Sequence, residues 1–582
     1  MHLVDIVPST LAVVGAWLVL ALLLAGVGHA VRRAVRLATA DRTADSLLPA
    51  DLWIGLATLA AYLQVWNLAA AVTWKAWLVP GMAALIGLAL GSRALRRLDL
   101  RTLSLPVLVV FGVGVLWLAN RSLAAAFFYD LGLYHFGSIE YASHFATVPG
   151  LGNLHGRLGA GNGHLLLVSF LDHGPLARIG FHIVNGLLAA MLFGDLAWRF
   201  ARRAQLRRMT SFTARVALLL LPALLVAIIG GKGSRLNNPD LDFAVFVLVV
   251  VGMLYFAECV ERGFQATPAL VSGSSLSLAA TTRPLYWPLA VVVVAVLVVL
   301  AARRPGGGRL LDRPTTVVVL LPVVLLGGWM GRQAVLSGYP LFPLTVGGLP
   351  VDWRMHAATV HGLNRFVSSW ARSPGDNPDV VLSSWRWFHP WLRHHQGDLD
   401  LVGPILLLAC VAPALVNRSP TEVGRRRAWR KPMLALALPA LPLLVAWFFN
   451  APDPRFALAP LWLLPIALVA WAVPSAPHGV LRGRPASGAV TYAGVAAVLV
   501  VTVALVGHKG VFRPIVSNLS GPLGTEPVPG AALVPFVTRS GLEIYRPARG
   551  ELCWRLPLCT PKPDPSLRLR GANLADGFRL GT

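Results

Sequence analysis

The sequence predicts an all-α polytopic membrane protein with about 14 transmembrane helices and a small extracytoplasmic cap at its C-terminal end. Three observations predict this fold. Hydrophobic residues fill 56% of the 582 positions and charged residues only 13%, whereas soluble domains carry roughly 25% charged residues. Apolar runs long enough to cross a bilayer recur along the chain. Short arginine clusters separate many of these runs, as expected for cytoplasmic loops.

The net charge of +25 follows from the same topology. There are 51 basic and 26 acidic residues. Nucleic-acid binding is one explanation for such a balance, but the arginines here lie in short loops between apolar runs, which the positive-inside rule predicts. We therefore expect the lipid bilayer as a partner and no nucleic acid.

The predicted spans alternate in direction. The first is followed by Arg32, Arg33 and Arg36, so it runs inward and is retained as a membrane helix rather than cleaved. Pro284 interrupts region 267–302, where we expect two shorter helices. The expected spans are 8–31, 50–70, 76–95, 103–120, 176–198, 213–230, 243–259, the two helices within 267–302, 315–336, 400–417, 431–449, 456–473 and 487–507.

This alternation places both chain ends outside and predicts two parts. Residues 1–507 form the membrane domain, and residues 508–582 form the cap, in which we expect short strands. Cys553 and Cys559 in the cap are close enough to form a disulfide if the cap lies outside the cytoplasm. The predicted outer loops of the membrane domain are 121–175, 231–242 and 337–399.

The polar clusters all fall on the predicted outer side, which suggests one site built from several loops. Asp130 follows a predicted span in the first large outer loop. A carboxylate there can act as a general base, and the alternatives are a helix cap or an ion pair with Arg121 or Arg157. Asp240 has two interpretations: Asn238-Pro239-Asp240 is a helix-start signal, and an exposed carboxylate could orient a phosphate or bind a divalent cation.

Basic residues on the same side are candidates for binding a phosphate. Lys232 and Arg235 depart from the positive-inside trend, which indicates a local anion. Arg455 can grip a phosphate with two hydrogen bonds, and the alternative is an ion pair with Asp453 or a side chain that extends to the membrane surface.

Histidines and aromatic residues complete the candidate set. The outer loop is rich in histidine but lacks the HExxH pattern of zinc hydrolases, so hydrogen bonding to a substrate is favoured over a metal site. Tryptophans of the 337–399 loop could stack on sugar rings or belong to an interfacial belt. The candidate substrate-binding residues are Tyr134, His135, His155, Arg157, Asp240, Tyr339 and Trp353.

The chain resembles the GT-C superfamily of membrane glycosyltransferases, many-span helical proteins whose first large outer loop carries an essential acid. Asp130 occupies that position. More specifically, the chain resembles an uncharacterised bacterial multipass membrane protein family grouped near those enzymes. The strings that carry this resemblance run from Tyr129 to His135, Pro149 to Leu158, Ser337 to Pro343, Pro452 to Phe456, and Cys553 to Pro561.

The resemblance implies transfer of a sugar from a polyprenyl-phosphate donor to an envelope glycan, lipid or protein acceptor, at the outer face of a bacterial plasma membrane. Many GT-C enzymes have paired acids in the first loop, whereas Leu131 follows Asp130 here. This departure favours a mechanism without a divalent metal, and we expect no cofactor. The alternatives are a lipid-linked glycan transporter or flippase, which needs charged residues along the spans, and a polymer ligase.

Overall fold

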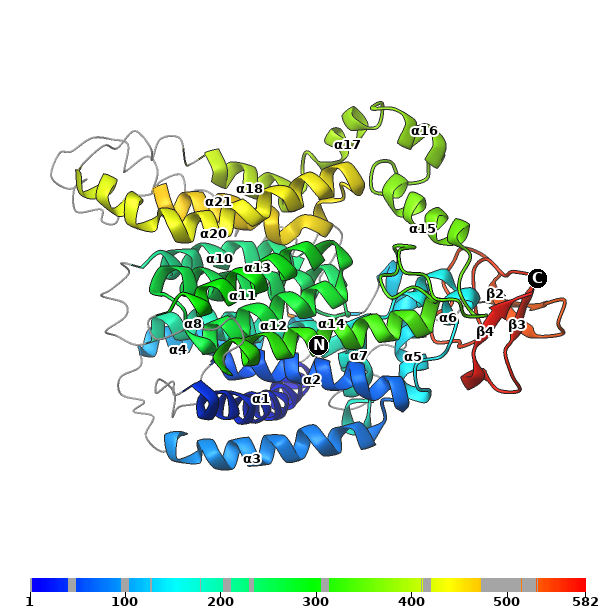
Figure 1. Ribbon diagram of the computed structural model, residues 1–582, viewed down its shortest axis with the longest axis horizontal. Coiled ribbons are helices and arrows are strands. Elements are labelled where there is room, and N and C mark those ends of the chain that lie inside the picture. Colours follow the sequence, from blue (N-terminus) through cyan, green and yellow to red (C-terminus); the bar gives the residue numbers. More distant parts are fainter. Residues whose placement is uncertain are drawn as a thin grey trace.

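The computed structural model describes most of the chain in helices, with short strands near the C-terminal end (Figure 1). The described residues are 3–39, 49–95, 104–125, 128–177, 179–201, 211–229, 235–304, 313–409, 411, 420–472, 514–515, 530 and 532–581.

Within these described ranges, 11 helices are long and apolar enough to cross a membrane. Their length and composition match the roughly 20 apolar residues that a bilayer requires, so the chain is a multipass membrane protein. The spanning helices are α1 (Leu3–Thr39), α2 (Pro49–Ala69), α3 (Leu78–Leu95), α4 (Leu105–Ser122), α8 (Gly180–Ala201), α10 (Phe212–Ile229), α11 (Leu241–Arg262), α13 (Trp287–Ala302), α14 (Arg313–Ser337), α20 (Pro420–Asn450) and α21 (Leu458–Ala472).

The expected break within 267–302 is confirmed. Helix α12 (Ala266–Thr282) ends just before Pro284, and α13 begins at Trp287. Three expected spans are not among the 11. Helix α12 has 17 residues and the apolar helix α18 (Leu399–Ala409) has 11, and 487–507 lies outside the described residues. A total of about 14 spans therefore stays a prediction.

The spanning helices lie side by side, with α11 among the most enclosed (Figure 1). Every side chain of α11 from Leu241 to Cys259 is buried. Its sequence is hydrophobic on all sides, and such a helix belongs in the interior of a bundle rather than at its surface. The buried position of α11 fixes its first turn beneath the loops at one end of the bundle.

Helices α1, α2 and α3 pack closely through glycines. A Cβ at Gly28 would lie 1.8 Å from the carbonyl oxygen of Asp51, and one at Gly55 would lie 1.9 Å from that of Leu24. Small residues allow backbones to approach this closely, which is the usual way that membrane helices associate. Substitution of either glycine would force these helices apart.

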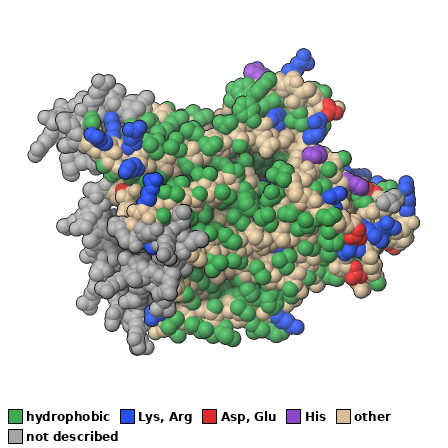
Figure 2. All heavy atoms as spheres, in the orientation of Figure 1, with side chains coloured by type: hydrophobic (Ala, Val, Ile, Leu, Met, Phe, Trp, Pro, Cys, Tyr) green, Lys and Arg blue, Asp and Glu red, His purple; other side chains and the backbone are tan. Residues whose placement is uncertain are grey.

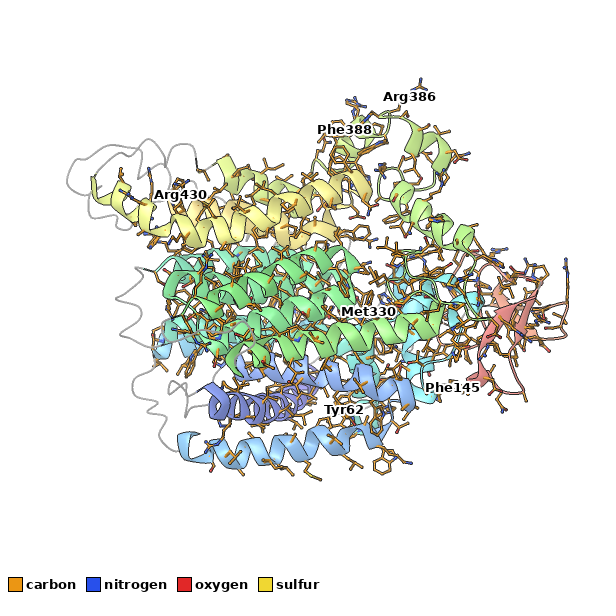
Figure 3. All side chains as sticks on the ribbon, viewed as in Figure 1. Tyr62, Phe145, Met330, Arg386, Phe388 and Arg430 are labelled. Carbon is orange, nitrogen blue, oxygen red and sulfur yellow. A yellow bond between two sulfur atoms is a disulfide. The ribbon has the colours of Figure 1, made fainter. Side chains whose placement is uncertain are left out.

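One end of the bundle carries the arginine-rich turns. There Arg199 Nη1 lies 3.1 Å from Glu258 Oε2, and Arg425 donates to the carbonyl oxygen of Trp471. Figure 3 shows Arg430 toward this end of α20 and Arg386 near the tip of the opposite end. Among the described residues, arginines at the end of α8 and at the start of α20 therefore lie at the same end of the bundle, as the alternation of spans predicts.

The other end carries most of the polar loops, folded into short helices. None of the described helices between Leu131 and Leu176 is long enough to span, which confirms the expectation for 131–175. The short elements at this end are η3 (Leu131–His135), α5 (Phe136–His144), α6 (Leu151–Leu154), η4 (Gly156–Gly159), α7 (Gly163–Leu171), η5 (Gly174–Leu176), α15 (Ala357–Trp370), α16 (Pro378–Ser383) and α17 (Phe388–His395).

The C-terminal cap lies at this end and has the expected short strands. Strands β1 (Leu533–Val537) and β2 (Glu543–Pro547) pair antiparallel, as do β3 (Leu567–Leu569) and β4 (Phe578–Leu580). The disulfide between Cys553 and Cys559 is confirmed. Figure 2 shows a broad hydrophobic surface over the spanning helices, with charged side chains gathered toward the two ends.

The cap packs into the membrane domain rather than standing apart from it. Ile544, Leu567 and Phe578 of the cap share a buried cluster with residues of the segment between α4 and α8. The backbone N–H of Phe578 donates to the carbonyl oxygen of Pro149 at 2.9 Å. This contact needs close backbone approach, since a Cβ at Gly577 would lie 2.1 Å from the same oxygen.

Candidate functional site

Asp130 lies on an unusual helical turn at the loop-rich end of the bundle. It directly precedes the π-helix η3, which continues into α5. The Asp130 side chain is half-buried, and Tyr129 beside it is exposed. Single π-helical turns are rare and occur frequently at functional sites. The loop after α4 therefore presents a carboxylate on a turn of the kind that proteins often use for function.

The first turn of α11 supplies two further carboxylates. Asp240 accepts a hydrogen bond from the backbone N–H of Phe243 at 2.8 Å, so it caps the helix, and the expected helix start is confirmed. Asp242 lies in the first turn and is buried. Burial and the neighbouring charge of Asp242 raise the pKa of Asp240 to about 6, because desolvation and a like charge both favour the neutral acid.

Asp242 contacts two arginines that come from separate loops. Arg283 Nη2 lies 2.6 Å from Asp242 Oδ1, and Arg455 Nε lies 3.8 Å from Asp242 Oδ2. The Asp242 side chain is 2% exposed, against 28% for Arg283 and 22% for Arg455. Each guanidinium therefore has a buried carboxylate on one side and contact with solvent on another.

Asp130 lies within electrostatic range of the same two arginines. Arg455 also pairs with Asp453, whose Oδ2 is 3.2 Å from Arg455 Nε. We call Asp130, Asp242, Arg283, Arg455 and Asp453 the acid–arginine cluster. It joins the loop after α4, the start of α11, the break before α13 and the turn before α21. Two cations within electrostatic range of a half-buried acid can bind an anion while the acid accepts a proton nearby.

Helix α15 covers this cluster with aromatic rings. Trp370 lies 5.0 Å from the Arg455 guanidinium carbon, and Phe366 lies 5.8 Å from that of Arg157. Arg157 also lies 5.6 Å from the ring of Tyr134. These are cation–π distances. The rings therefore hold the arginine side chains in place and cover them from the loop side.

The opposite face of α15 borders an open groove of about 460 Å³. Residues three, four and seven apart share one side of a helix. Phe366 and Trp370 therefore share the face with the cation–π contacts, and the groove residues of α15 share the opposite face. Polar residues of α15 line the groove, and Phe449 at the end of α20 borders it with a 61% exposed side chain. The residues lining the groove are His361, Asn364, Arg365, Ser368, Arg372, Leu382, Phe449 and Asn450.

Three histidines in the segment between α4 and α8 are buried, and His135 lies within electrostatic range of Arg283 and Asp242. Burial lowers the pKa of His155 and His164 to about 4 and that of His135 well below its ordinary value. All three are therefore neutral at pH 7. Neither ring nitrogen of His135 has a hydrogen-bond partner among the described residues. A neutral imidazole in this state can donate to or accept from an uncharged ligand group.

Residues 11–462 match a family described as a domain of unknown function, DUF8201, over more than three quarters of the chain. The chain belongs to this family. No curated protein matches it, and no solved structure does. The whole acid–arginine cluster lies within the matched residues, whereas the disulfide of the cap lies beyond them.

The other predicted site residues fall in different surroundings. Arg235 is buried and pairs with Asp400 at 2.7 Å and with Asp240 at 3.9 Å. Tyr339 is buried, with its hydroxyl donating to the carbonyl oxygen of Met355. Trp353 packs under the guanidinium of Arg570 in the cap, 4.5 Å away. Arg235 lies within electrostatic range of Asp242, but both of its ion pairs are with carboxylates outside the acid–arginine cluster. Lys232 lies outside the described residues.

The sequence interpretation left Arg283, Asp242 and Trp370 out of the predicted site. Arg283 lies at the break between α12 and α13, which the alternation of spans predicts to be on the outer side, so it departs from the positive-inside trend in the same way as Arg235. That signal could have identified it. Asp242 and Trp370 carry no comparable signal, because each acquires its role through a partner far away in the sequence.

Acidification is expected to destabilise the fold through the buried histidines. His155 and His164 have pKa values of about 4 when folded, against 6.5 for the unfolded chain. The unfolded state binds more protons in this window, so stability falls as the pH drops from 6.5 toward 4. Asp240 acts in the opposite sense, since its raised pKa means that the folded state takes up its proton first.

Thermal unfolding of the purified protein in detergent at pH 7 and pH 5 measures the net effect. At pH 5 the protonation of each of these two histidines lowers the free energy of unfolding by about 2 kcal/mol. Together the two losses exceed the stabilisation from Asp240. The melting temperature should therefore fall, and H155Q should reduce the fall. A melting temperature that rises toward pH 5 would contradict this assignment.

Replacing Asp242 with asparagine is expected to destabilise the fold by about 2–3 kcal/mol. The change leaves Arg283 and Arg455 without their shared buried carboxylate, and removing one partner of a buried ion pair is costly, although solvent at the two arginines reduces the loss. The matched control is D379N, since Asp379 is 82% exposed and pairs with Arg365. Chemical or thermal unfolding should show little change for the control, and equal effects of both variants would refute the role of Asp242.

Proposed function

We propose that this protein is a GT-C-type glycosyltransferase. It moves a sugar from a polyprenyl-phosphate donor to a glycan, lipid or protein acceptor of the cell envelope. One observation carries the proposal: Arg283 and Arg455 come from separate loops, both contact the buried Asp242 and both keep contact with solvent, and Asp130 lies within electrostatic range of the two. The resemblance to GT-C enzymes, which use an acid in the first outer loop, supports the same assignment.

In the proposed reaction Asp130 is the general base. It takes the proton of the acceptor hydroxyl as the acceptor oxygen bonds to the sugar's anomeric carbon. The bond from that carbon to the phosphate oxygen breaks, and polyprenyl phosphate leaves with the electron pair. Attack from the face opposite the leaving group inverts the anomeric centre. No divalent metal takes part in this scheme.

Arg455 and Arg283 hold the leaving phosphate in this proposal. Charge grows on the phosphate as the bond breaks, and fixed cations act most strongly where charge develops. Asp242 orients both guanidinium groups through its contacts at 2.6 Å and 3.8 Å. The sequence suggested Arg235 for binding the phosphate, but Arg235 is already paired with two buried carboxylates. We therefore assign this role to Arg283.

The neutral donors around the cluster would bind the sugar. His135 has two unpartnered ring nitrogens among the described residues, and His155 has one. Tyr134 lies under Arg157, at the edge of the covering helix α15. These groups suit hydroxyl recognition because neutral imidazole and phenol each donate and accept hydrogen bonds.

The outward orientation is also part of the proposal. The disulfide of the cap is typical of an oxidising compartment, and the cap lies at the same end as the acid–arginine cluster. The arginine-rich turns lie at the other end, which suits the cytoplasmic side. We propose a bacterial plasma membrane with the site facing outward.

A lipid-linked glycan transporter or flippase is the second candidate, favoured by charged residues inside the spans. Arg32 and Asp51 form a buried pair at 2.6 Å, and Asp195 with Arg199 forms another at 3.2 Å. Ionisable groups within spans often mark transport pathways. These pairs lie within about two turns of the ends of their helices, so they give the transporter less support than a path through the centre would. A polymer ligase differs from the first proposal only in its acceptor.

Lipid and glycan analysis of cells separates these functions. Cells that lack the gene are compared with wild-type cells for polyprenyl-linked sugars and for surface glycans. A transferase predicts accumulation of the donor lipid on the outer leaflet and loss of one glycan linkage. Accumulation on the inner leaflet would instead indicate a flippase and would refute the transferase.

A further inference from the structure

The disulfide loop of the cap, residues 553–559, packs directly on the segment that begins at Tyr129. The backbone N–H of Trp554 donates to the carbonyl oxygen of Gly132 at 2.7 Å. The hydroxyl of Tyr141 in α5 donates to the carbonyl oxygen of Pro557, also at 2.7 Å. Just before the loop, Glu551 accepts a hydrogen bond from the hydroxyl of Tyr129 at 3.0 Å. The flanks of Asp130 and the end of α5 are therefore tied to one short stretch of the cap.

Trp554 and Gly132 form the closest part of this contact. A Cβ at Gly132 would lie 3.0 Å from atoms of the Trp554 ring, so only glycine gives this ring its full space. Trp554 is buried and has φ of 52°. A bulky residue in the left-handed region is strained and persists only where its surroundings hold it. The covalent closure from Cys553 to Cys559 provides such a constraint on one side, and the docking onto Gly132 provides it on the other.

Arg555 extends this attachment to two further elements. Its guanidinium pairs with Glu140 of α5 and with Asp172 after α7, the latter at 3.4 Å. It also lies 4.3 Å from the ring of Phe136 and 5.6 Å from that of Phe181 at the start of α8. One side chain of the cap therefore fastens α5 to the neighbouring loop and helix, using both charge and cation–π contact.

From these contacts we infer that the disulfide loop is the positioning element of the Asp130 segment, with Trp554 and Arg555 as positioning residues. A π-helical turn lacks the intrinsic stability of an α-helix and needs support from its surroundings. The loop supplies this support from a part of the chain more than 400 residues away. The inference concerns the order of the segment and rests on the proposed function only for what Asp130 then does.

Hydrogen exchange on the purified full-length protein tests the inference without an activity assay. R555Q is expected to raise amide exchange in residues 129–144 about tenfold, because charge-assisted contacts that anchor a local unit are lost. R555K should restore part of the protection. The matched control is R570Q, which alters the contacts of the same cap with Asp352 and Trp353 and should leave 129–144 unchanged.

Reduction of the folded wild-type protein provides a second perturbation that does not depend on folding of a variant. Both cysteines are buried, so the concentration of reductant is raised until thiol labelling shows that the bond between Cys553 and Cys559, the one disulfide among the described residues, has opened. Opening should raise exchange in 129–144 while α11 stays protected. Unchanged exchange in 129–144 after both treatments would overturn the inference. D130N should leave this exchange unchanged even if it abolishes transfer, so failure of the positioning role and failure of the catalytic role give different results.

Discussion

Replacing Asp130 with asparagine is expected to lower sugar transfer by about 10²–10⁴-fold, the contribution typical of a general base. Asparagine keeps the size of the side chain and the turn before η3 but cannot accept the proton of the acceptor hydroxyl. Binding of the donor should change little. Transfer is measured with membranes that carry the variant, using polyprenyl-linked sugars extracted from cells that lack the gene.

The matched control for this prediction is D376N. Asp376 is an exposed acid at the same end of the bundle and accepts a hydrogen bond from Ser373 in the loop after α15. Its replacement should leave transfer at the wild-type rate. Full activity of D130N in the same assay would show that Asp130 is not the base. This conclusion would hold whichever lipid-linked sugar is the donor.

Replacing Arg283 or Arg455 with glutamine is expected to lower transfer by about 10²–10³-fold, the effect of removing one group that stabilises charge in a transition state. Each arginine contacts Asp242 and also reaches solvent, so each can turn part of its guanidinium toward a phosphate. Both variants should reduce the maximal rate more than the affinity for the donor, because the phosphate gains most of its charge as the bond breaks.

R386Q is the control for the arginine variants. Arg386 lies at the exposed tip between α16 and α17, away from the acid–arginine cluster (Figure 3). Its replacement should not change the rate. The arginine variants must also be compared at equal amounts of folded protein, since both disturb the ion pairs around Asp242. A loss of rate that follows the loss of folded protein would assign the arginines a structural role alone.

Much of the helical frame could be predicted from the sequence. Apolar length predicts a span because the bilayer fixes the length that must be covered, and Pro284 predicts the break between α12 and α13 because proline cannot continue a helix. The pairing of Cys553 with Cys559 follows from their spacing in a polar tail. The span count does not follow in the same way, because α18 is a short apolar helix that composition alone does not distinguish from a span.

The site was only partly predictable. Asp130 is conspicuous as an acid next to an apolar run, and Arg455 as a cation at a proline turn. Asp242 looks like an ordinary residue of a helix start, and its position between Arg283 and Arg455 arises from packing of loops that are distant in the sequence. The cap shows the same limit: its composition predicts strands and a disulfide, but not that Trp554 rests on Gly132.

The most direct measurement follows the fate of the donor lipid in vesicles that contain only the purified protein, polyprenyl-phosphate sugar and a lipid extract that supplies the acceptor. The proposal predicts that free polyprenyl phosphate appears in equal amount to sugar joined to the acceptor, and that D130N abolishes both. Movement of intact donor between the leaflets, with no release of polyprenyl phosphate, would contradict it.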